Sequence, residues 1–153
     1  MEVYRICLAE YAQDLYASGN RGRWNSKGHF VIYTASSRAL ACLENVVHRG
    51  GEGLNQRFKV IVIQIPDDLA VETITLEELP PNWHKTRNYS LCQPLGDAWY
   101  ERKTAPVLRV PSSIIASEFN YILHARHPDF ARIRISSREE FAFDPRIKAE
   151  NQE

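Results

Sequence analysis

The segment from Phe58 to Ile65, FKVIVIQI, constrains the fold of this chain more than any other stretch. Its β-branched and apolar residues are typical of a strand, and the unbroken run from Val60 to Ile63 predicts burial on both faces at one end. The turn-forming sequence Pro66-Asp67-Asp68 follows it directly. The chain is therefore expected to contain a sheet with at least one deeply buried strand.

Further short segments have the β-branched or aromatic character of strands. The predicted strands are Val3–Leu8, His29–Thr34, Pro106–Val110, Phe119–Leu123 and Ala131–Ile135, with Phe141–Phe143 as one further candidate. Strands outnumber helices and do not alternate with them regularly. This order favours an α+β fold with a mainly antiparallel or mixed sheet and flanking helices.

Two helices are predicted. Ser36 or Ser37 can cap the first, in which apolar residues recur at helical spacing until the pair Gly50-Gly51 ends it. The second is Asn88–Arg102, where Pro94 either disturbs the helix or marks its true start.

Length and composition limit the classes of protein to which the chain can belong. A chain of 153 residues fits one domain and can bury enough surface to fold without a disulfide or a metal. The 19 Lys and Arg balance the 19 Asp and Glu, which argues against a protein that coats nucleic acid or an acidic membrane. The 3 cysteines are far apart and form no CxxC, which indicates reduced thiols. Because no signal-peptide pattern and no run of about 20 apolar residues occurs, we expect a cytoplasmic protein.

The stretch from Gly22 to His48, GRWNSKGHFVIYTASSRALACLENVVH, combines a predicted loop, strand and helix. It places one polar group on each of them, Arg23, Tyr33 and Glu44. Glu44 is unusual because its helix neighbours are mostly apolar, and a carboxylate buried without a partner is costly. The alternative is a surface glutamate paired with His48, four residues further on. If the three groups converge, they meet at a common cleft.

Six short motifs occur in one order along the chain. They are GRWN (22–25), YTASS (33–37), LExxxH (43–48), GDAWYE (96–101), VPSxI (110–114) and FDPR (143–146). Together they resemble the signature of RES-domain proteins, and the resemblance covers nearly the whole chain. It implies a single RES domain over residues 1–147, with a frayed tail at 148–153. It also implies a fold like that of ADP-ribosyltransferases of the diphtheria-toxin type.

The resemblance further implies a function. RES proteins are toxins of bacterial toxin–antitoxin pairs that consume NAD by cleaving the bond between nicotinamide and ribose. The implied acceptor is water, inorganic phosphate or a protein side chain, and the implied partner is an Xre-type helix-turn-helix antitoxin that covers the active site. NAD would be a substrate, with no prosthetic group and no metal. A homodimer within the complex is a further expectation, whereas direct binding to nucleic acid or membrane is not expected.

The arginine, tyrosine, glutamate and serine of the family correspond here to Arg23, Tyr33, Glu44 and Ser112. Arg23 suits the pyrophosphate, because a guanidinium can fork onto phosphate oxygens. Tyr33 can stack on nicotinamide, and Glu44 can oppose the positive charge that develops on the ribose. Ser112 could hydrogen-bond the nicotinamide amide, the ribose or Glu44. The plainer interpretations are a surface arginine, a tyrosine at the edge of the core and a capping serine.

Three further polar residues are candidates for contacts with NAD. Asn25 either binds the ligand or fixes the GRWN loop through backbone hydrogen bonds. Arg5 belongs to a second basic-aromatic pair that could face the same cleft, and Arg21 could share the phosphate-binding role of Arg23.

Other types of site are less well supported by the sequence. His124, His127 and Asp129 suggest a metal site, but no further ligand set accompanies them, and polar loop histidines are the preferred interpretation. No GxSxG, P-loop or GxGxxG motif occurs. A ribonuclease toxin would require basic patches, which the neutral net charge disfavours. The remaining alternatives are a protein ADP-ribosyltransferase that uses NAD, and a module that binds a nucleotide or an antitoxin without turnover.

Overall fold

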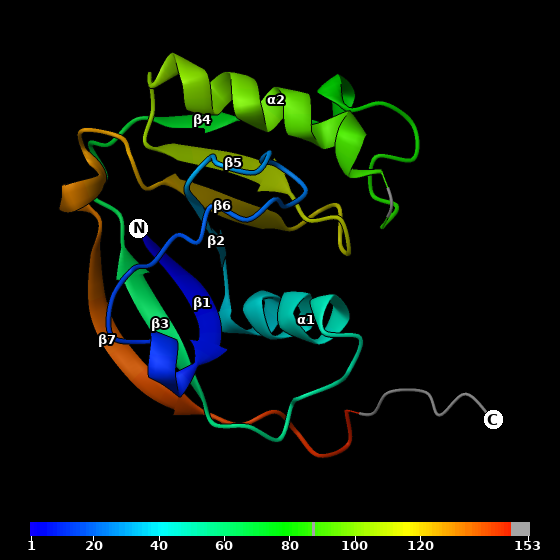
Figure 1. Ribbon diagram of the computed structural model, residues 1–153, viewed down its shortest axis with the longest axis vertical. Coiled ribbons are helices and arrows are strands. Elements are labelled where there is room, and N and C mark those ends of the chain that lie inside the picture. Colours follow the sequence, from blue (N-terminus) through cyan, green and yellow to red (C-terminus); the bar gives the residue numbers. More distant parts are fainter. Residues whose placement is uncertain (87, 148–153) are drawn as a thin grey trace.

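The computed structural model describes residues 1–86 and 88–147, and these form a seven-stranded sheet with two α-helices (Figure 1). The strands are β1 (Glu2–Leu8), β2 (Val31–Ala35), β3 (Phe58–Gln64), β4 (Val71–Thr73), β5 (Val107–Pro111), β6 (Phe119–His124) and β7 (Arg134–Phe141). The helices are α1 (Arg38–His48) and α2 (Tyr89–Arg102). The predicted α+β class is confirmed, whereas the expected tail at 148–153 lies outside the described residues.

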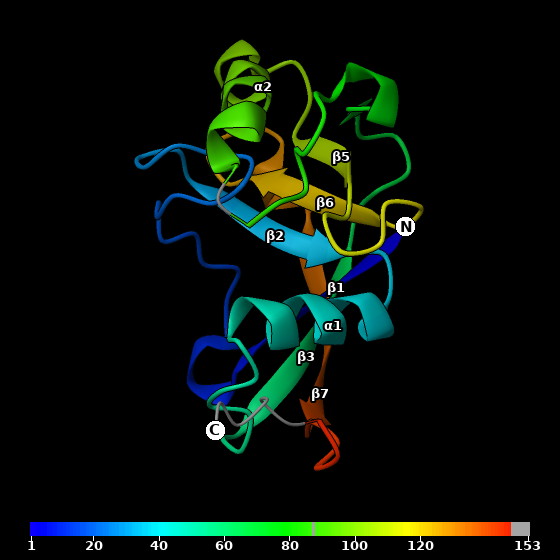
Figure 2. The same cartoon turned by 90° about the vertical axis from the view of Figure 1, so that its right-hand side faces the viewer.

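The sheet has the strand order β4-β5-β6-β2-β1-β3-β7 and is mixed. The pair β4 and β5 is parallel, and the other pairings between the described strands are antiparallel. One residue pair, Tyr4 with Ala35, joins β1 to β2, whereas β1 pairs with β3 along its whole length. This narrow seam divides the sheet into two halves that turn away from each other, as Figure 2 shows.

Each half of the sheet packs against its own helix. The α2 cluster contains Cys92, Trp99, Leu108, Val110 and Ile122, and the α1 cluster contains Ile6, Ala35, Leu40, Val60 and Val62. A third cluster on the opposite face contains Val3, Ile32, Ile61, Ile63 and Leu123. Alternate residues of β3 enter two of these clusters, so the predicted burial of this strand on both faces is confirmed.

The structure confirms the residues predicted to begin and end α1, and it shows which of the two candidate serines caps the helix. Ser37 caps α1, because its hydroxyl accepts a hydrogen bond from the backbone N–H of Leu40. Gly50, just past the end of α1, has φ +61°, a conformation that glycine adopts without strain. Pro94 does not start α2, because the helix already begins at Tyr89 and continues through the proline.

The C-terminal strand was predicted at the wrong positions. We expected strands at Ala131–Ile135 and Phe141–Phe143, but residues Phe130–Arg132 form a 3-10 turn and the strand is Arg134–Phe141. This strand, RISSREEF, is a polar edge strand whose pairing with β3 comes from backbone hydrogen bonds. Its mostly exposed side chains gave no apolar pattern to follow. The short strand β4 was also not predicted.

Candidate active site

Glu44 extends from α1 to the other half of the sheet. Its Oε1 accepts two hydrogen bonds, one from the hydroxyl of Ser112 at 2.8 Å and one from Nδ2 of Asn120 at 2.7 Å. Ser112 follows β5 directly and Asn120 lies in β6. The alternative of a surface glutamate paired with His48 is therefore wrong, because Glu44 is bound across the fold by two polar groups.

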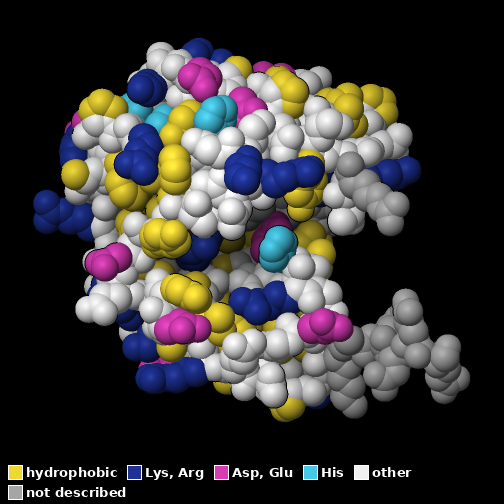
Figure 3. All heavy atoms as spheres, in the orientation of Figure 1, with side chains coloured by type: hydrophobic (Ala, Val, Ile, Leu, Met, Phe, Trp, Pro, Cys, Tyr) yellow, Lys and Arg dark blue, Asp and Glu magenta, His cyan; other side chains and the backbone are white. Residues whose placement is uncertain are grey.

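The surface around Glu44 lies between the two helix clusters. Tyr33 and Ala35 point to the same face of β2, where their partners in β6 are Ile122 and Asn120. Ile122 belongs to the α2 cluster and Ala35 to the α1 cluster, so this face runs from one helix to the other. Figure 3 shows that the molecule is hollowed between its two halves, with acidic side-chain atoms visible inside the hollow. We call this region the Glu44 cleft.

Ser112 is fully buried, and its hydroxyl has a fixed orientation. The oxygen accepts from the backbone N–H groups of Ile114 and Ile115, at 3.1 and 3.2 Å, and donates its proton to Glu44. Among the three partners that the sequence left open, the structure shows the contact with Glu44. Because a hydroxyl has only one proton, the hydrogen bond to Glu44 uses the single side-chain donor of Ser112.

Arg23 fastens the GRWN loop to the segment that precedes α2. Its guanidinium donates to the carbonyl oxygens of Trp83 at 2.6 Å, Lys85 at 3.2 Å and His84 at 3.4 Å. It also lies over the ring of Tyr89, 4.9 Å from the centroid. These contacts give Arg23 a structural use, and its predicted contact with phosphate stays a prediction.

Tyr33 and Asn25 form the support of the same loop. The hydroxyl of Tyr33 donates to Oδ1 of Asn25 at 2.6 Å and accepts from the backbone N–H of Trp24 at 3.0 Å. The amide of Asn25 donates to the carbonyl oxygens of Asn20, Ser26 and His29. Burial raises the pKa of Tyr33, so the phenol stays protonated and keeps donating at neutral pH. Of the two roles considered for Asn25, the structure places it in loop fixation.

Replacement of Tyr33 by phenylalanine should therefore weaken the loop while leaving the aromatic ring in place. The change leaves the buried N–H of Trp24 and Oδ1 of Asn25 without their partner, which costs about 1–3 kcal/mol of unfolding free energy. Denaturant unfolding measures this loss. Tyr11→Phe is the matched control, because Tyr11 is 59% exposed. Equal stability of the two variants would contradict this role of the hydroxyl.

Arg5 occupies the seam between β1 and β2. Its Nη1 donates to the carbonyl oxygen of Tyr33 at 2.9 Å, close to where the two strands separate. Among the described residues no carboxylate lies within 4.0 Å of its guanidinium. Burial lowers the pKa of Arg5, as expected for a cation taken out of water. A guanidinium in this situation is suited to an anionic ligand.

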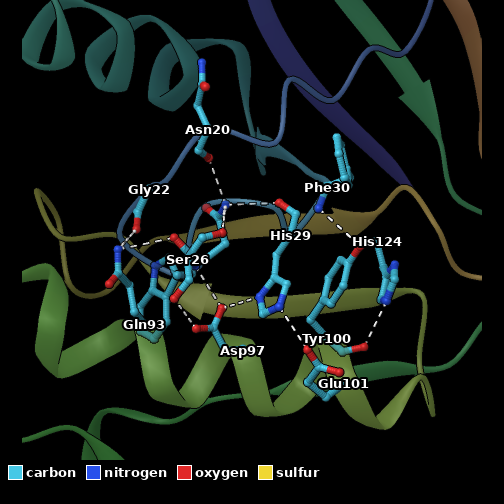
Figure 4. Close-up of polar contacts among 12 residues, drawn as sticks. Asn20, Gly22, Ser26, His29, Phe30, Gln93, Asp97, Tyr100, Glu101 and His124 are labelled. Carbon is cyan, nitrogen blue, oxygen red and sulfur yellow. Dashed lines mark hydrogen bonds and ion pairs between the residues drawn. The ribbon is translucent and has the colours of Figure 1, made fainter.

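The GRWN loop is also held against α2 by a polar network (Figure 4). His29 lies between two carboxylates of α2, with Nδ1 2.6 Å from Asp97 Oδ1 and Nε2 2.9 Å from Glu101 Oε1. Ser26 donates to Asp97 through both its backbone N–H and its hydroxyl. The ring of His29 stacks on that of Tyr100. The loop that carries Arg23 is thus fixed to α2 mainly through Asp97.

The pKa of Asp97 gives a pH dependence for this network. Burial by itself would raise the pKa, but the hydrogen bonds from Ser26 and His29 together lower it below its ordinary value. A carboxylate with a lowered pKa stabilises the fold fully above about pH 4, and this contribution is lost as the pH falls through the folded-state pKa. The charge of Asp97 should therefore stabilise the fold at neutral pH, and this stabilisation should be lost in acid.

We expect Asp97→Asn to lower the unfolding free energy by about 1–3 kcal/mol at neutral pH, since it removes a charged and largely buried acceptor. The difference from the wild type should shrink toward zero as Asp97 of the wild type becomes protonated. Thermal unfolding measured from neutral to strongly acidic pH checks both statements. Glu101→Gln is the control, because Glu101 is 68% exposed and its pair with His29 should contribute at most about 1 kcal/mol. A stability difference independent of pH would contradict the role given to the Asp97 charge.

The histidines considered as metal ligands have other uses. Nδ1 of His124 accepts from the backbone N–H of Arg126, and Nδ1 of His127 accepts from that of Asp129. Each Nε2 faces a backbone carbonyl, that of Tyr100 or Lys103, and must therefore carry the proton. Burial lowers the pKa of His124, in agreement with a neutral ring. Both rings are thus committed to the backbone around the end of β6.

Comparison with known proteins gives this arrangement its family. The model of the RES domain matches residues 2–144. This chain belongs to the RES domain family. The resemblance read from the six motifs is thereby confirmed.

The RES chain is 35% identical over 141 residues to the "Prs ADP-ribosylating toxin" of Sphingobium sp. (strain YBL2), covering 89% of this chain and 88% of that protein. It is 34% identical over 153 residues to "Toxin Res" of Yersinia enterocolitica, covering 97% of this chain and 100% of that one.

The fold of the RES chain is similar to that of a chain in the crystal structure of the M. tuberculosis MbcT–MbcA toxin–antitoxin complex. The TM-score is 0.77, with 19% sequence identity, over 92% of this chain and 84% of that chain. This similarity supports the fold described above. In the part of the RES chain that the structure describes, neither helix is long and apolar enough to cross a membrane.

The structure adds two polar residues that sequence reasoning did not select. Asp97 lies within the GDAWYE motif, but its role depends on contacts with a loop about 70 residues earlier in the chain. Asn120 gave a usable signal, because it stands in the strand FNYILH among mostly apolar and aromatic residues. The same reasoning that selected Glu44, a polar residue in an apolar stretch, could have found it.

Proposed function

We propose that this RES-family toxin cleaves NAD between nicotinamide and ribose. The observation that carries the proposal is the asymmetric environment of Glu44. Its Oε1 is held by Ser112 and Asn120, while no described residue donates to its Oε2. One carboxylate oxygen is thus fixed and the other is left for a ligand in the Glu44 cleft. A preoriented carboxylate of this kind can accept from a ribose hydroxyl and oppose developing positive charge.

The bond that breaks is the one between the ribose carbon and the ring nitrogen of nicotinamide. Its electron pair leaves with nicotinamide, which becomes neutral, and the ribose acquires oxocarbenium character. Glu44 stabilises this cation and orients the acceptor, whose oxygen bonds to the ribose carbon as its proton is released. The ring of Tyr33 would stack on nicotinamide, since its hydroxyl is already used by the loop.

The pyrophosphate would be held by arginine. Arg5 is the stronger structural candidate, because it is half-buried and has no described carboxylate partner, whereas the donors of Arg23 are used by three backbone carbonyls. Arg23 would then act by shaping the loop or by exchanging these carbonyls for phosphate when NAD binds. Ser112 and Asn25 were predicted to contact NAD. In this proposal Ser112 instead supports Glu44, and Asn25 supports the GRWN loop.

Water and inorganic phosphate are the proposed acceptors, which would make the protein an NAD glycohydrolase or an NAD phosphorylase. A protein side chain is the second candidate, favoured by the name of the Sphingobium relative, an ADP-ribosylating toxin. We also propose that an Xre-type antitoxin neutralises the toxin in the cytoplasm by covering the Glu44 cleft. The support for a partner is that the similar MbcT fold was solved in a toxin–antitoxin complex.

Controlled expression in bacteria tests this function. Cellular NAD should fall before growth stops when the wild type is induced, and it should stay constant when Glu44→Gln is induced to the same level. Mass spectrometry of the same cells separates the acceptors, since free ADP-ribose, its phosphate ester and modified proteins differ in mass. Growth arrest at constant NAD, with no ADP-ribosylated product, would contradict the proposal.

A further inference from the structure

Asn120 makes the shorter of the two hydrogen bonds to Glu44, and the motifs read from the sequence gave Asn120 no role. Its Nδ2 lies 2.7 Å from Oε1 of Glu44, beside the hydroxyl of Ser112 at 2.8 Å from the same oxygen. Asn120 lies in β6 and pairs directly with Val110 of β5, and Ser112 stands two residues after Val110, just past the end of β5. Both donors are therefore positioned by one strand pair, Asn120 within it and Ser112 at its end, where the Ser112 N–H donates to the carbonyl oxygen of Glu118.

The orientation of the Asn120 amide follows from its partner. An ionised carboxylate can only accept, so the amide must turn its NH₂ group toward Glu44 and its oxygen away. In that orientation Oδ1 is buried, and no described residue donates to it. An unpaired buried acceptor costs about 1–3 kcal/mol, and an apolar residue in β6 would avoid this cost. Despite this cost the chain has an asparagine at this position, and its side chain supplies a second hydrogen-bond donor to Glu44.

We propose that Asn120 is a positioning residue that acts through Glu44. Together with Ser112 it holds Oε1, so that Oε2 is presented to the substrate in one orientation. This inference rests on the proposed cleavage of NAD for its kinetic consequence, while the contact itself can be tested without activity. The positioning role predicts an effect on kcat, because a carboxylate held less tightly stabilises the transition state less well.

Two substitutions separate positioning from packing. Asn120→Ala removes the donor, and kcat for nicotinamide release should fall about 10–100-fold with KM changed by less than about 3-fold. Asn120→Asp keeps the size of the side chain but places a second carboxylate against Oε1, so kcat at neutral pH should fall further than in Asn120→Ala. A residue that only fills space would give the opposite order, since aspartate is nearly isosteric with asparagine.

Thr34→Val is the matched control for local damage to β6. The hydroxyl of Thr34 donates to the carbonyl oxygen of Tyr121, next to Asn120, and does not touch Glu44. This variant should lose stability and keep kcat within about 2-fold of the wild type for the folded fraction. Equal kcat for Asn120→Ala and the wild type, or a rise in KM alone, would overturn the proposal.

Nuclear magnetic resonance of the Asn120 side-chain amide tests the contact independently of turnover. In the wild type one amide proton should resonate downfield and exchange slowly with solvent, because it is bonded to a carboxylate. Glu44→Ala should abolish both properties, whereas Glu52→Gln, a change at an exposed residue, should leave them intact. A wild-type amide with ordinary shifts and fast exchange would overturn the positioning role. The downfield signal in a protein that releases no nicotinamide would support the contact and count against the proposed function instead.

Discussion

Replacement of Glu44 by glutamine is expected to slow nicotinamide release by about 10²–10³-fold, the usual effect of removing one preoriented electrostatic group from an active site. The glutamine oxygen can still accept from Ser112 and Asn120, which turns its NH₂ group to the position of Oε2. A donor would then stand where the account requires a negatively charged acceptor. The fold should persist, because both hydrogen bonds to Oε1 are retained.

The measurement is a time course of nicotinamide release at saturating NAD, with the thermal unfolding midpoint determined for each sample. Glu52→Gln serves as the control, since Glu52 is an exposed glutamate in the segment that follows α1. It should match the wild type in both rate and stability. If Glu44→Gln kept full activity, Glu44 could not have the central role given to it here.

The second large effect is expected at Gly96, where α2 crosses the GRWN loop at backbone contact. A Cβ at this position would lie 1.8 Å from the carbonyl oxygen of Trp24. Helix and loop would have to move apart by roughly 1.5 Å to reach an ordinary contact. The hydrogen bonds that Gln93 donates to Gly22 and that Ser26 donates to Asp97 span the same junction and would be strained. We expect Gly96→Ala to cost about 1–3 kcal/mol, which lowers the unfolding midpoint by about 2–12 °C.

Calorimetry of Gly96→Ala and of a control on the same helix checks this expectation. Ala98 is exposed, so Ala98→Gly should cost only the intrinsic helix preference of about 1 kcal/mol and leave nicotinamide release unchanged. Gly96→Ala should lose activity as well as stability, because the loop that carries Arg23 is displaced. An unfolding midpoint equal to that of the wild type would show that the junction is looser than described.

Much of the fold could be predicted from signals that are local in the sequence. The buried strand β3, the cap at Ser37 and the glycines after α1 depend on residues close in sequence, and the structure has each of them. The polar strand β7 has no such signal, because its pairing with β3 uses the backbone and leaves most of its side chains exposed. Pro94 was expected to disturb the second helix or to mark its start, but α2 runs from Tyr89 to Arg102, and Cys92 and Trp99 on either side of the proline are buried in the α2 cluster.

The candidate site was predictable only in part, because its contacts join distant segments. The oddly placed carboxylate Glu44 could be recognised from its apolar neighbours, and the motif pattern selected Ser112, which the structure places against it. Asn120, from β6, could not be paired with Glu44 before the strands were arranged. For Arg23, the contacts with three backbone carbonyls could not be foreseen from the sequence either, and its expected contact with phosphate stays a prediction.

The central claim is that the folded chain by itself breaks the bond between nicotinamide and ribose. The most direct measurement incubates the purified, folded wild type with NAD, in the presence and in the absence of inorganic phosphate, and quantifies nicotinamide over time. The account predicts nicotinamide release by many turnovers per protein molecule in at least one of the two conditions. No release in either condition, from a sample that unfolds cooperatively, would contradict it.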